Sequence, residues 1–277
     1  MKAITALLCA AVLAPSAFAA TRSVPSQYST VQAAINAAAA GDTIAIANGT
    51  YSGQFSIPSS KTGLIIQGAS NTGTILTSGQ NQTTMTVQAT DVTIKNIKLQ
   101  NTYTGDTNTN HVLVVQAARC AVRASYLNGR QDTLYALGTS SSVYVTGSEI
   151  QGTVDFVYGH GRIFITNSTI RQIRGNGGTI GAPATASGQN YGIVFSGCTI
   201  ASGGTATSGS SYLGRPWGAY GELAFINCTI SNVIASVGYI EWSAKDCAVA
   251  LNYAKNSSVL DPTDRTTLLN ELVAPSP

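Results

Sequence analysis

The sequence predicts an all-β fold, a parallel β-helix in which each turn of the chain stacks on the previous one. Short alternating apolar runs, rich in β-branched residues and flanked by Gly, Asn and Ser, recur along the chain. The steps between their final aliphatic residues are 28, 23, 20, 30 and 30 residues. Self-similarity at this period is typical of one structural unit stacked on the next. These final residues are Leu99, Leu127, Ile150, Ile170, Ile200 and Ile230.

The repeated runs favour a β-helix over other solenoids. They show neither two helical patterns per repeat nor a leucine-rich consensus. They read "VTIKNIKL" (92–99), "AVRASYL" (121–127), "VYVTGSEI" (143–150), "IFITNSTI" (163–170), "IVFSGCTI" (193–200) and "LAFINCTI" (223–230). We interpret each run as a strand. Two positions before each final aliphatic residue, mostly small side chains predict an inward ladder: Ile97, Ser125, Ser148, Ser168, Cys198 and Cys228.

Helices are expected at both ends of the solenoid. For the stretch 29–41 we predict Ser29 as N-cap, Gln32 completing a capping box and Gly41 as the C-terminal stop. Such a helix would cover the first coil and protect an open sheet edge. A second, C-terminal helix is predicted at 261–273.

The first nineteen residues have the pattern of a signal peptide. Lys2 precedes an apolar run, and Ala17 and Ala19 suit the −3 and −1 positions of a cleavage site. The run is too short to span a bilayer, and no later stretch is long and apolar enough. We therefore predict a signal peptide at 1–19, one domain at 20–277 and secretion.

The net charge limits the classes of partner that this chain is expected to bind. Without Lys2 the formal charge is 14 − 12 = +2, too small to indicate a nucleic-acid partner. Between Asp106 and Glu222, seven arginines accompany three acids. This segment favours a polyanionic substrate, or its arginines are simply solvated on several faces.

Secretion permits disulfides, but the pairing of the cysteines stays open, and the stacked Cys198 and Cys228 could equally be free thiols. The remaining cysteines are Cys120, Cys198, Cys228 and Cys247, and glycan sequons occur at Asn48, Asn81, Asn167, Asn227 and Asn256.

Two aspartates form the candidate site. Asp132 lies five residues after Leu127, and Asp155 lies five after Ile150, so they are 23 residues apart, as are those two coils. Equivalent positions on adjacent coils should be about one strand spacing apart. Carboxylates so close do not ionise independently, so one can be an acid while the other stays an anion. The alternative is that one caps a turn and the other pairs with an arginine.

Three motifs resemble the signatures of the pectin methylesterase (pectinesterase) family. They are "GRQDTLYA" (129–136), "GTVDFVYG" (152–159) and "YLGRPWG" (212–218), in the family order. The resemblance implies a right-handed parallel β-helix and hydrolysis of the C6 methyl ester of galacturonate in pectin. It implies no metal and no cofactor, and the partner would be methylated homogalacturonan, bound by a monomer away from any membrane.

The resemblance also implies a role for individual residues. Asp155 would be the nucleophile, Asp132 the general acid/base and Gln131 an oxyanion donor. Arg215 would hold Asp155 ionised and oriented. Predicted substrate-binding residues are Trp217, Tyr135, Phe156 and Asn110. We assign His160 no role, since two histidines offer no metal set.

The chain departs from the family pattern at several positions. Val112 follows His111 where a glutamine is usual; Asn110 could substitute for it, and we expect Gln116 to point elsewhere. Arg130 stands where tyrosine is common. Two other classes therefore stay open: a pectate lyase, which would need more acidic calcium ligands than this segment has, and a catalytically weakened β-helix that binds pectin or cell-wall polysaccharide.

Overall fold

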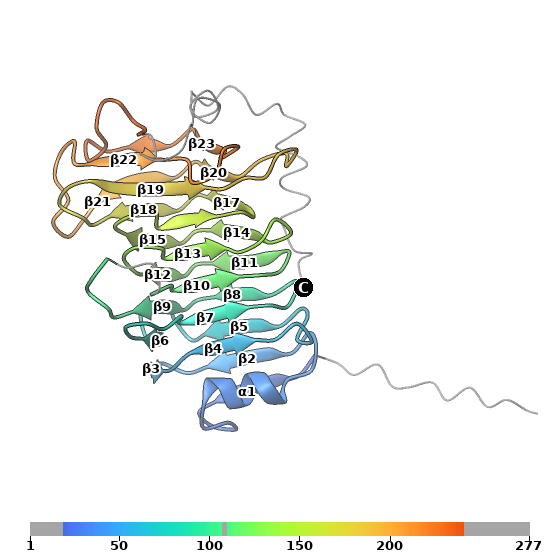
Figure 1. The fold of residues 1–277 in the computed structure, drawn as a ribbon. Helices are drawn as coiled ribbons and strands as arrows, with labels where there is room; N and C mark the ends of the chain where they lie inside the picture. Colours follow the sequence, from blue (N-terminus) through green and yellow to red (C-terminus); the bar gives the residue numbers. More distant parts are fainter. Residues whose placement is uncertain (1–18, 107–109, 241–277) are drawn as a thin grey trace, which may run out of the picture.

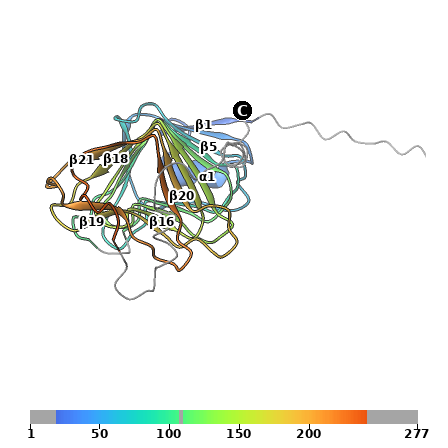
Figure 2. The same cartoon turned by 90° about the horizontal axis from the view of Figure 1, so that it is seen from above.

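The computed structural model describes residues 19–106 and 110–240, and these form a parallel β-helix. The strands stack from the end where the helix α1 lies to the end where β22 and β23 lie (Figure 1). Seen from above, three sheets enclose the core (Figure 2). The predicted signal peptide up to residue 18 and the predicted C-terminal helix at 261–273 lie outside the described residues.

All strands of the described residues pair in parallel within these three sheets. The first sheet contains β1 (Thr21–Val24), β2 (Thr43–Ile46), β5 (Ile65–Gly68), β8 (Thr93–Lys95), β11 (Cys120–Arg123), β14 (Ser142–Thr146), β17 (Arg162–Thr166), β20 (Ile193–Ser196) and β23 (Leu223–Ile226). The second contains β3 (Gly49–Ser52), β6 (Thr74–Ser78), β9 (Lys98–Asn101), β12 (Tyr126–Asn128), β15 (Glu149–Gly152), β18 (Thr169–Gln172), β21 (Thr199–Ser202) and β24 (Thr229–Ile230). The third contains β4 (Phe55–Ile57), β7 (Met85–Val87), β10 (Leu113–Val115), β13 (Leu134–Ala136), β16 (Val157–Gly159), β19 (Gly178–Pro183) and β22 (Ser211–Gly214).

The predicted aliphatic column is confirmed by the strand register. Leu127 pairs with Leu99 on one side and with Ile150 on the other. The pairing continues in the same way through Ile170, Ile200 and Ile230. All but the last of these side chains are buried, so each coil contributes one apolar layer to a continuous core.

Each repeated run is two strands rather than the single strand we predicted. A residue with positive φ bends the chain out of the first sheet and into the second, as at Asn96 (φ 53°) and Asn167 (φ 46°). Asn and Gly adopt this left-handed conformation at low cost, which explains why they recur there. The corner residues are Asn96, Ala124, Gly147, Asn167, Gly197 and Asn227.

The predicted inward ladder is confirmed and is held by hydrogen bonds. The hydroxyl of Ser125 accepts from the backbone N–H of Ile97 (3.3 Å), that of Ser148 from Ser125 (3.1 Å) and that of Ser168 from Ser148 (3.1 Å). These buried donors and acceptors are thus satisfied at the bend of each coil.

The cysteines of the described residues are free thiols. Cys198 and Cys228 continue the ladder, and the Cys198 thiol donates to the Ile165 carbonyl. Cys120 is buried, and burial raises its pKa to about 12. Cys247 lies outside the described residues.

One short helix, α1 (Val31–Ala37), packs against β1, β2 and β4 at the end of the stack. Its N-cap is Thr30 rather than Ser29: the Thr30 hydroxyl accepts from the N–H of Ala33 (3.1 Å). The Gln32 side chain completes no capping box and instead accepts from the N–H of Ser56 (2.8 Å). The helix ends at Ala37, before the predicted stop at Gly41. Within the described residues, no helix has the length and apolarity needed to cross a bilayer.

Candidate active site

The structure brings Asp132 and Asp155 to equivalent positions on adjacent coils. Each lies two residues before a strand of the third sheet, and the strands pair with Leu134 opposite Val157. The backbone N–H of Asp132 donates to the carbonyl of Val154 at 3.1 Å. Both aspartates have left-handed backbones (φ 61° and 48°), and they are only 6% and 4% exposed. The adjacency predicted from the 23-residue spacing is confirmed.

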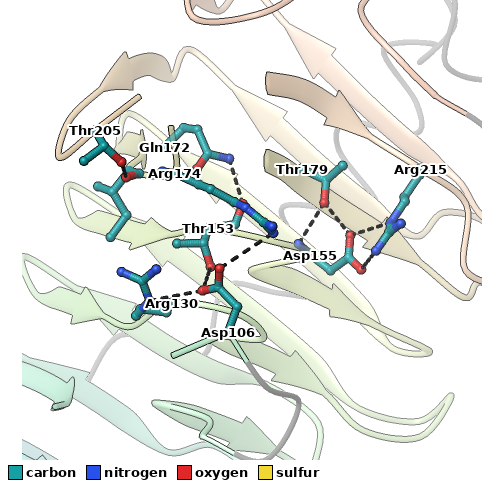
Figure 3. Close-up of polar contacts among 10 residues, drawn as sticks. Asp106, Arg130, Thr153, Asp155, Gln172, Arg174, Thr179, Thr205 and Arg215 are labelled. Carbon is teal, nitrogen blue, oxygen red and sulfur yellow. Dashed lines mark hydrogen bonds and ion pairs between the residues drawn. The ribbon is translucent and has the colours of Figure 1, made fainter. Parts of the chain in front are cut away.

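Two side chains from later coils hold the Asp155 carboxylate (Figure 3). The Arg215 guanidinium donates from Nε to Oδ1 (3.0 Å) and from Nη2 to Oδ2 (2.7 Å). The Thr179 hydroxyl donates to Oδ1 (2.6 Å) and accepts from the Asp155 N–H (3.0 Å). Bidentate, charge-assisted contacts of this kind fix both the orientation and the charge of a carboxylate.

The surroundings of Asp132, in contrast, favour its neutral, protonated form. Burial, together with the negative charge of Asp155, raises the pKa of Asp132 to about 8, although the positive charge of Arg215 and a hydrogen bond with Tyr158 act against the rise. At neutral pH Asp132 is therefore mainly protonated beside an arginine-bound Asp155. Such a pair can supply an acid and an anion at the same time.

A hydrogen-bonded chain extends outward from Asp132. The Tyr158 hydroxyl bonds with the Asp132 carboxyl and lies 2.8 Å from Nε2 of His111. Burial is the main reason that the pKa of Tyr158 is raised and that of His111 is lowered, so both are neutral near pH 7. His111 lies two residues before Leu113, which pairs with Leu134, and so occupies the coil below Asp132.

Aromatic rings cover the third sheet beside the aspartates. The rings of Tyr135 and Tyr158 stack at 4.2 Å on neighbouring strands. Trp217 meets Tyr158 at 5.7 Å and Tyr135 at 6.5 Å, while His160 meets Trp217 edge-on at 4.8 Å. The structure thus brings predicted Trp217 and Tyr135 together in a half-buried aromatic surface suited to a sugar ring.

Two other predicted residues lie near the pair without a demonstrated role. Gln131 directly precedes Asp132 and is half-buried; its side chain forms no hydrogen bond within the part of the chain that the structure describes. Asn110 is buried, and its side-chain oxygen accepts from the N–H of Asn81 (2.6 Å). Their assignments to the oxyanion and the substrate stay predictions.

The prediction that Phe156 binds substrate is wrong. Its side chain is completely buried in the hydrophobic core, so it offers no surface to a substrate. Val112 is likewise buried in the core and brings no polar group to the site. Gln116 points elsewhere, as expected, and pairs with Gln88 on the surface.

A second polar group, which we call the arginine cluster, lies beside Asp155 in the same close-up (Figure 3). Asp106 accepts from Arg130 Nε (3.1 Å) and from the Thr153 hydroxyl (2.7 Å), and Arg174 Nη1 lies 3.6 Å from its other oxygen. Arg130 and Thr153 each lie two residues before one of the two aspartates.

Sequence reasoning missed Thr179, Tyr158 and His111. Tyr158 follows Tyr135 by the same 23 residues that separate the aspartates, so coil arithmetic could have found it. Thr179 gave no such signal, because the longer connection between β18 and β19 changes the spacing. No three His, Cys, Asp or Glu side chains gather as a possible metal site within residues 19–106 and 110–240.

Comparisons with known proteins agree with this geometry. The family model for pectinesterase matches residues 19–262. A pectinesterase from Aspergillus niger is 30% identical over 269 residues, covering 87% of this chain and 80% of its own. Pectin methylesterase from carrot superposes with a TM-score of 0.75 at 25% identity, covering 85% of this chain and 80% of its own. A pectin methylesterase solved in complex with a hexasaccharide superposes with a TM-score of 0.73 at 20% identity, covering 95% and 99%. The family resemblance expected from the three motifs is therefore confirmed: the chain belongs to the pectinesterase family of carboxylic ester hydrolases.

Proposed function

We propose that this protein is a secreted pectin methylesterase that hydrolyses the C6 methyl ester of galacturonate units to methanol and the free acid. The observation that carries the proposal is the buried pair of aspartates in different states, Asp155 held by Arg215 and Asp132 with a raised pKa. Ester hydrolysis through an acyl-enzyme needs one carboxylate as the nucleophile and one carboxylic acid as the proton donor.

In the first step, Asp155 attacks the ester carbonyl. A carboxylate oxygen bonds to the carbonyl carbon, and the bond from that carbon to the methoxy oxygen breaks as the tetrahedral intermediate collapses. The departing methoxide takes the proton of Asp132 and leaves as methanol. Gln131, whose side chain forms no hydrogen bond within the described residues, donates to the oxyanion as negative charge develops.

In the second step, water hydrolyses the acyl-enzyme. Asp132, now a carboxylate, takes a proton from the water as the hydroxide adds to the acyl carbon. The anhydride bond to Asp155 breaks, which regenerates the nucleophile and releases the acid. Because Asp132 donates and then accepts the same kind of proton, its pKa near neutrality suits both directions.

The substrate is a methylated homogalacturonan chain lying across the third sheet. Trp217 and Tyr135 provide the surface on which a sugar ring stacks. The hexasaccharide complex of a structural relative supports a polysaccharide ligand. We further propose that the protein acts as a monomer, without a metal or other cofactor, after removal of residues 1–19.

The test is mass spectrometry of a fully methylated oligogalacturonide incubated with purified protein and EDTA. The esterase loses methyl groups one at a time and leaves the chain intact. A lyase would cleave the chain to an unsaturated product and would lose activity in EDTA. Binding without any mass change would favour the catalytically weakened β-helix and would contradict the proposal.

A further inference from the structure

Cys198 and Cys228 occupy equivalent positions on adjacent coils. The strands that precede them, β20 and β23, pair in register, and so do the strands that follow them, β21 and β24. The corner residue before each cysteine, Gly197 or Asn227, has a left-handed backbone in both coils (φ 63° and 51°). Neighbouring parallel strands lie about 4.8 Å apart, and a disulfide needs a Cα separation of roughly 4.4–6.8 Å. The backbone therefore meets the distance that a bridge between the two residues requires.

The two sulfur atoms point the same way and contact each other. Each thiol lies near the carbonyl two residues earlier, at 3.6 Å for Cys198 and 3.5 Å for Cys228. Each also lies near a carbonyl of the preceding coil, at 3.4 Å from Ile165 and 3.6 Å from Phe195 respectively. The Cys198 thiol is hydrogen-bonded to the Cys228 sulfur as well. The cysteines thus form a pair of thiols rather than two isolated groups.

The two thiols differ in exposure and in acidity. Cys198 is buried and Cys228 is half-buried, so a reagent from solvent meets Cys228 first. The hydrogen bond from Cys198 stabilises the thiolate of Cys228 and lowers its pKa, while the same bond, together with burial, raises the pKa of Cys198. Because the thiolate is the nucleophile in disulfide exchange, Cys228 is suited to attack and Cys198 to resolve the mixed disulfide.

The surroundings of the pair can keep their backbone hydrogen bonds when a bridge forms. The sulfur of Cys198 accepts from the Ser168 N–H, and the sulfur of Cys228 accepts from the Cys198 N–H. These contacts use sulfur lone pairs, which a disulfide retains, and only the weak S–H donors are given up. The hydroxyls of Ser148 and Ser168 accept in the same way in earlier coils, so serine is the matched replacement for either cysteine.

The chain between the two cysteines is the coil that carries Arg215. It contains β21, β22 and β23, and in the part of the chain that the structure describes β22 and β23 are the terminal strands of their sheets (Figure 1). Beyond β22 the described residues add only two isolated bridges. Strands with a paired neighbour on one side open at a lower free energy than inner strands. A bond between the two ends of this coil would oppose such opening and keep Arg215 against Asp155.

We propose that Cys198 and Cys228 are a site of oxidative modification, at which the secreted protein forms a disulfide bond between adjacent coils. The Cys228 thiolate attacks a small disulfide such as oxidised glutathione, which gives a mixed disulfide and one free thiolate. The Cys198 thiol then loses its proton to water, its sulfur attacks Sγ of Cys228, and the second glutathione thiolate leaves. The protein loses two protons and two electrons, and the small disulfide is reduced to two thiols. Formation of the bond rests on the proposed secretion and is independent of the proposed esterase activity.

Peptide mapping of the secreted protein, alkylated without reductant, tests the bond directly. Glu222 lies between the cysteines, so trypsin with glutamyl endopeptidase places them on separate peptides, 175–222 and 223–241, while Cys120 and Cys247 fall on others. We expect the first two peptides to be joined and to separate after reduction. Free thiols at Cys198 and Cys228, or a link from either one to another cysteine, would overturn the proposal.

Thermal unfolding with and without reductant measures what the bond contributes. Closing the segment between the cysteines should raise the melting temperature by roughly 5–10 °C, and reductant should remove the gain. The double variant Cys198→Ser/Cys228→Ser should melt close to the reduced wild type and should not respond to reductant. Cys120→Ala, which removes a buried thiol paired with Val143, should keep the difference between the oxidised and reduced forms. Should the double variant fail to fold, the peptide map of the wild type still decides whether the bond forms.

The consequence for the site is measured as the rate of heat inactivation, followed by methanol release from pectin. Initial rates at room temperature should be equal for the oxidised and reduced wild type, because the cysteines lie between the first and second sheets and the aspartates lie before the third. Just below the melting temperature, the oxidised protein should have a half-life several-fold longer. Equal half-lives would contradict a role of the bond in holding the coil of Arg215. If pectin releases no methanol at all, the proposed function fails, while the peptide map still decides the disulfide.

Discussion

Arg215 binds both carboxylate oxygens of Asp155, at 3.0 and 2.7 Å, from a position 60 residues later in the chain. The contact joins the connection before β16 to the residue that follows β22, across the intervening strand β19. Because Asp155 is 4% exposed, solvent does little to stabilise its charge, and Arg215 is the cation that does so, beside the hydroxyl of Thr179. The site therefore depends on an ion pair that the stacking of coils creates.

Arg215→Ala should lower the free energy of unfolding by about 3–5 kcal/mol, because it leaves a buried carboxylate unpaired. Arg119→Ala, which breaks a partly exposed pair with Asp91, should cost about 0–1 kcal/mol. Urea unfolding near pH 7 measures both. Similar losses of unfolding free energy for the two variants would contradict the claim that burial makes the Arg215–Asp155 ion pair important for stability.

Thr179→Val should lower stability by about 1–3 kcal/mol and also reduce kcat. The valine has nearly the same shape but leaves the Asp155 N–H without its acceptor and removes one of the two donors to Oδ1 of the carboxylate. Thr179→Ser keeps the hydroxyl and should recover most of both losses. Thermal unfolding and methanol release measure the two effects, and a fully active valine variant would contradict a positioning role for Thr179.

Tyr158→Phe should shift the alkaline limb of the kcat/KM profile to higher pH. The hydrogen bond from Tyr158 lowers the pKa of Asp132, so its loss lets that pKa rise further. Activity in the first step requires protonated Asp132, and this form then persists to higher pH. Tyr144→Phe, which removes a hydroxyl bonded to Thr166 on the first sheet, should leave the profile unchanged. A downward shift for Tyr158→Phe would contradict the assignment.

Asp132→Asn should become progressively more stable than the wild type as the pH rises. The pKa of Asp132 is about 8 in the folded protein against an ordinary value of 3.8. The folded state thus holds this proton more tightly than the unfolded chain does. The contribution to stability is fully present below about pH 4 and is lost as the pH rises through 8. Melting temperatures of both proteins across this range test it, and a constant difference would argue against the raised pKa.

The sequence predicted the repeated architecture well because the period-2 pattern and the coil spacing both persist along the chain. The corners were missed, because each run keeps its alternation on both sides of a single left-handed residue such as Asn96. The N-cap was displaced by one residue, since Ser29 and Thr30 are both good caps and only the observed bond to Ala33 distinguishes them.

The aspartate pair could be predicted because both lie at the same offset from a column residue. Phe156 was misassigned because nearness in sequence to Asp155 says nothing about direction, and consecutive side chains here point to the core and to the site. Thr179, His111 and the arginine cluster come from turns of unequal length. Their contacts follow from three-dimensional stacking that no short motif encodes.

The most direct test of the central claim is methanol release from highly methylated pectin, with EDTA present, by the wild type beside Asp155→Ala. We predict sustained release by the wild type and none above background by the variant, with both proteins folded by circular dichroism. Retained release by Asp155→Ala would contradict Asp155 as nucleophile, and a folded but inactive wild type would contradict the esterase itself.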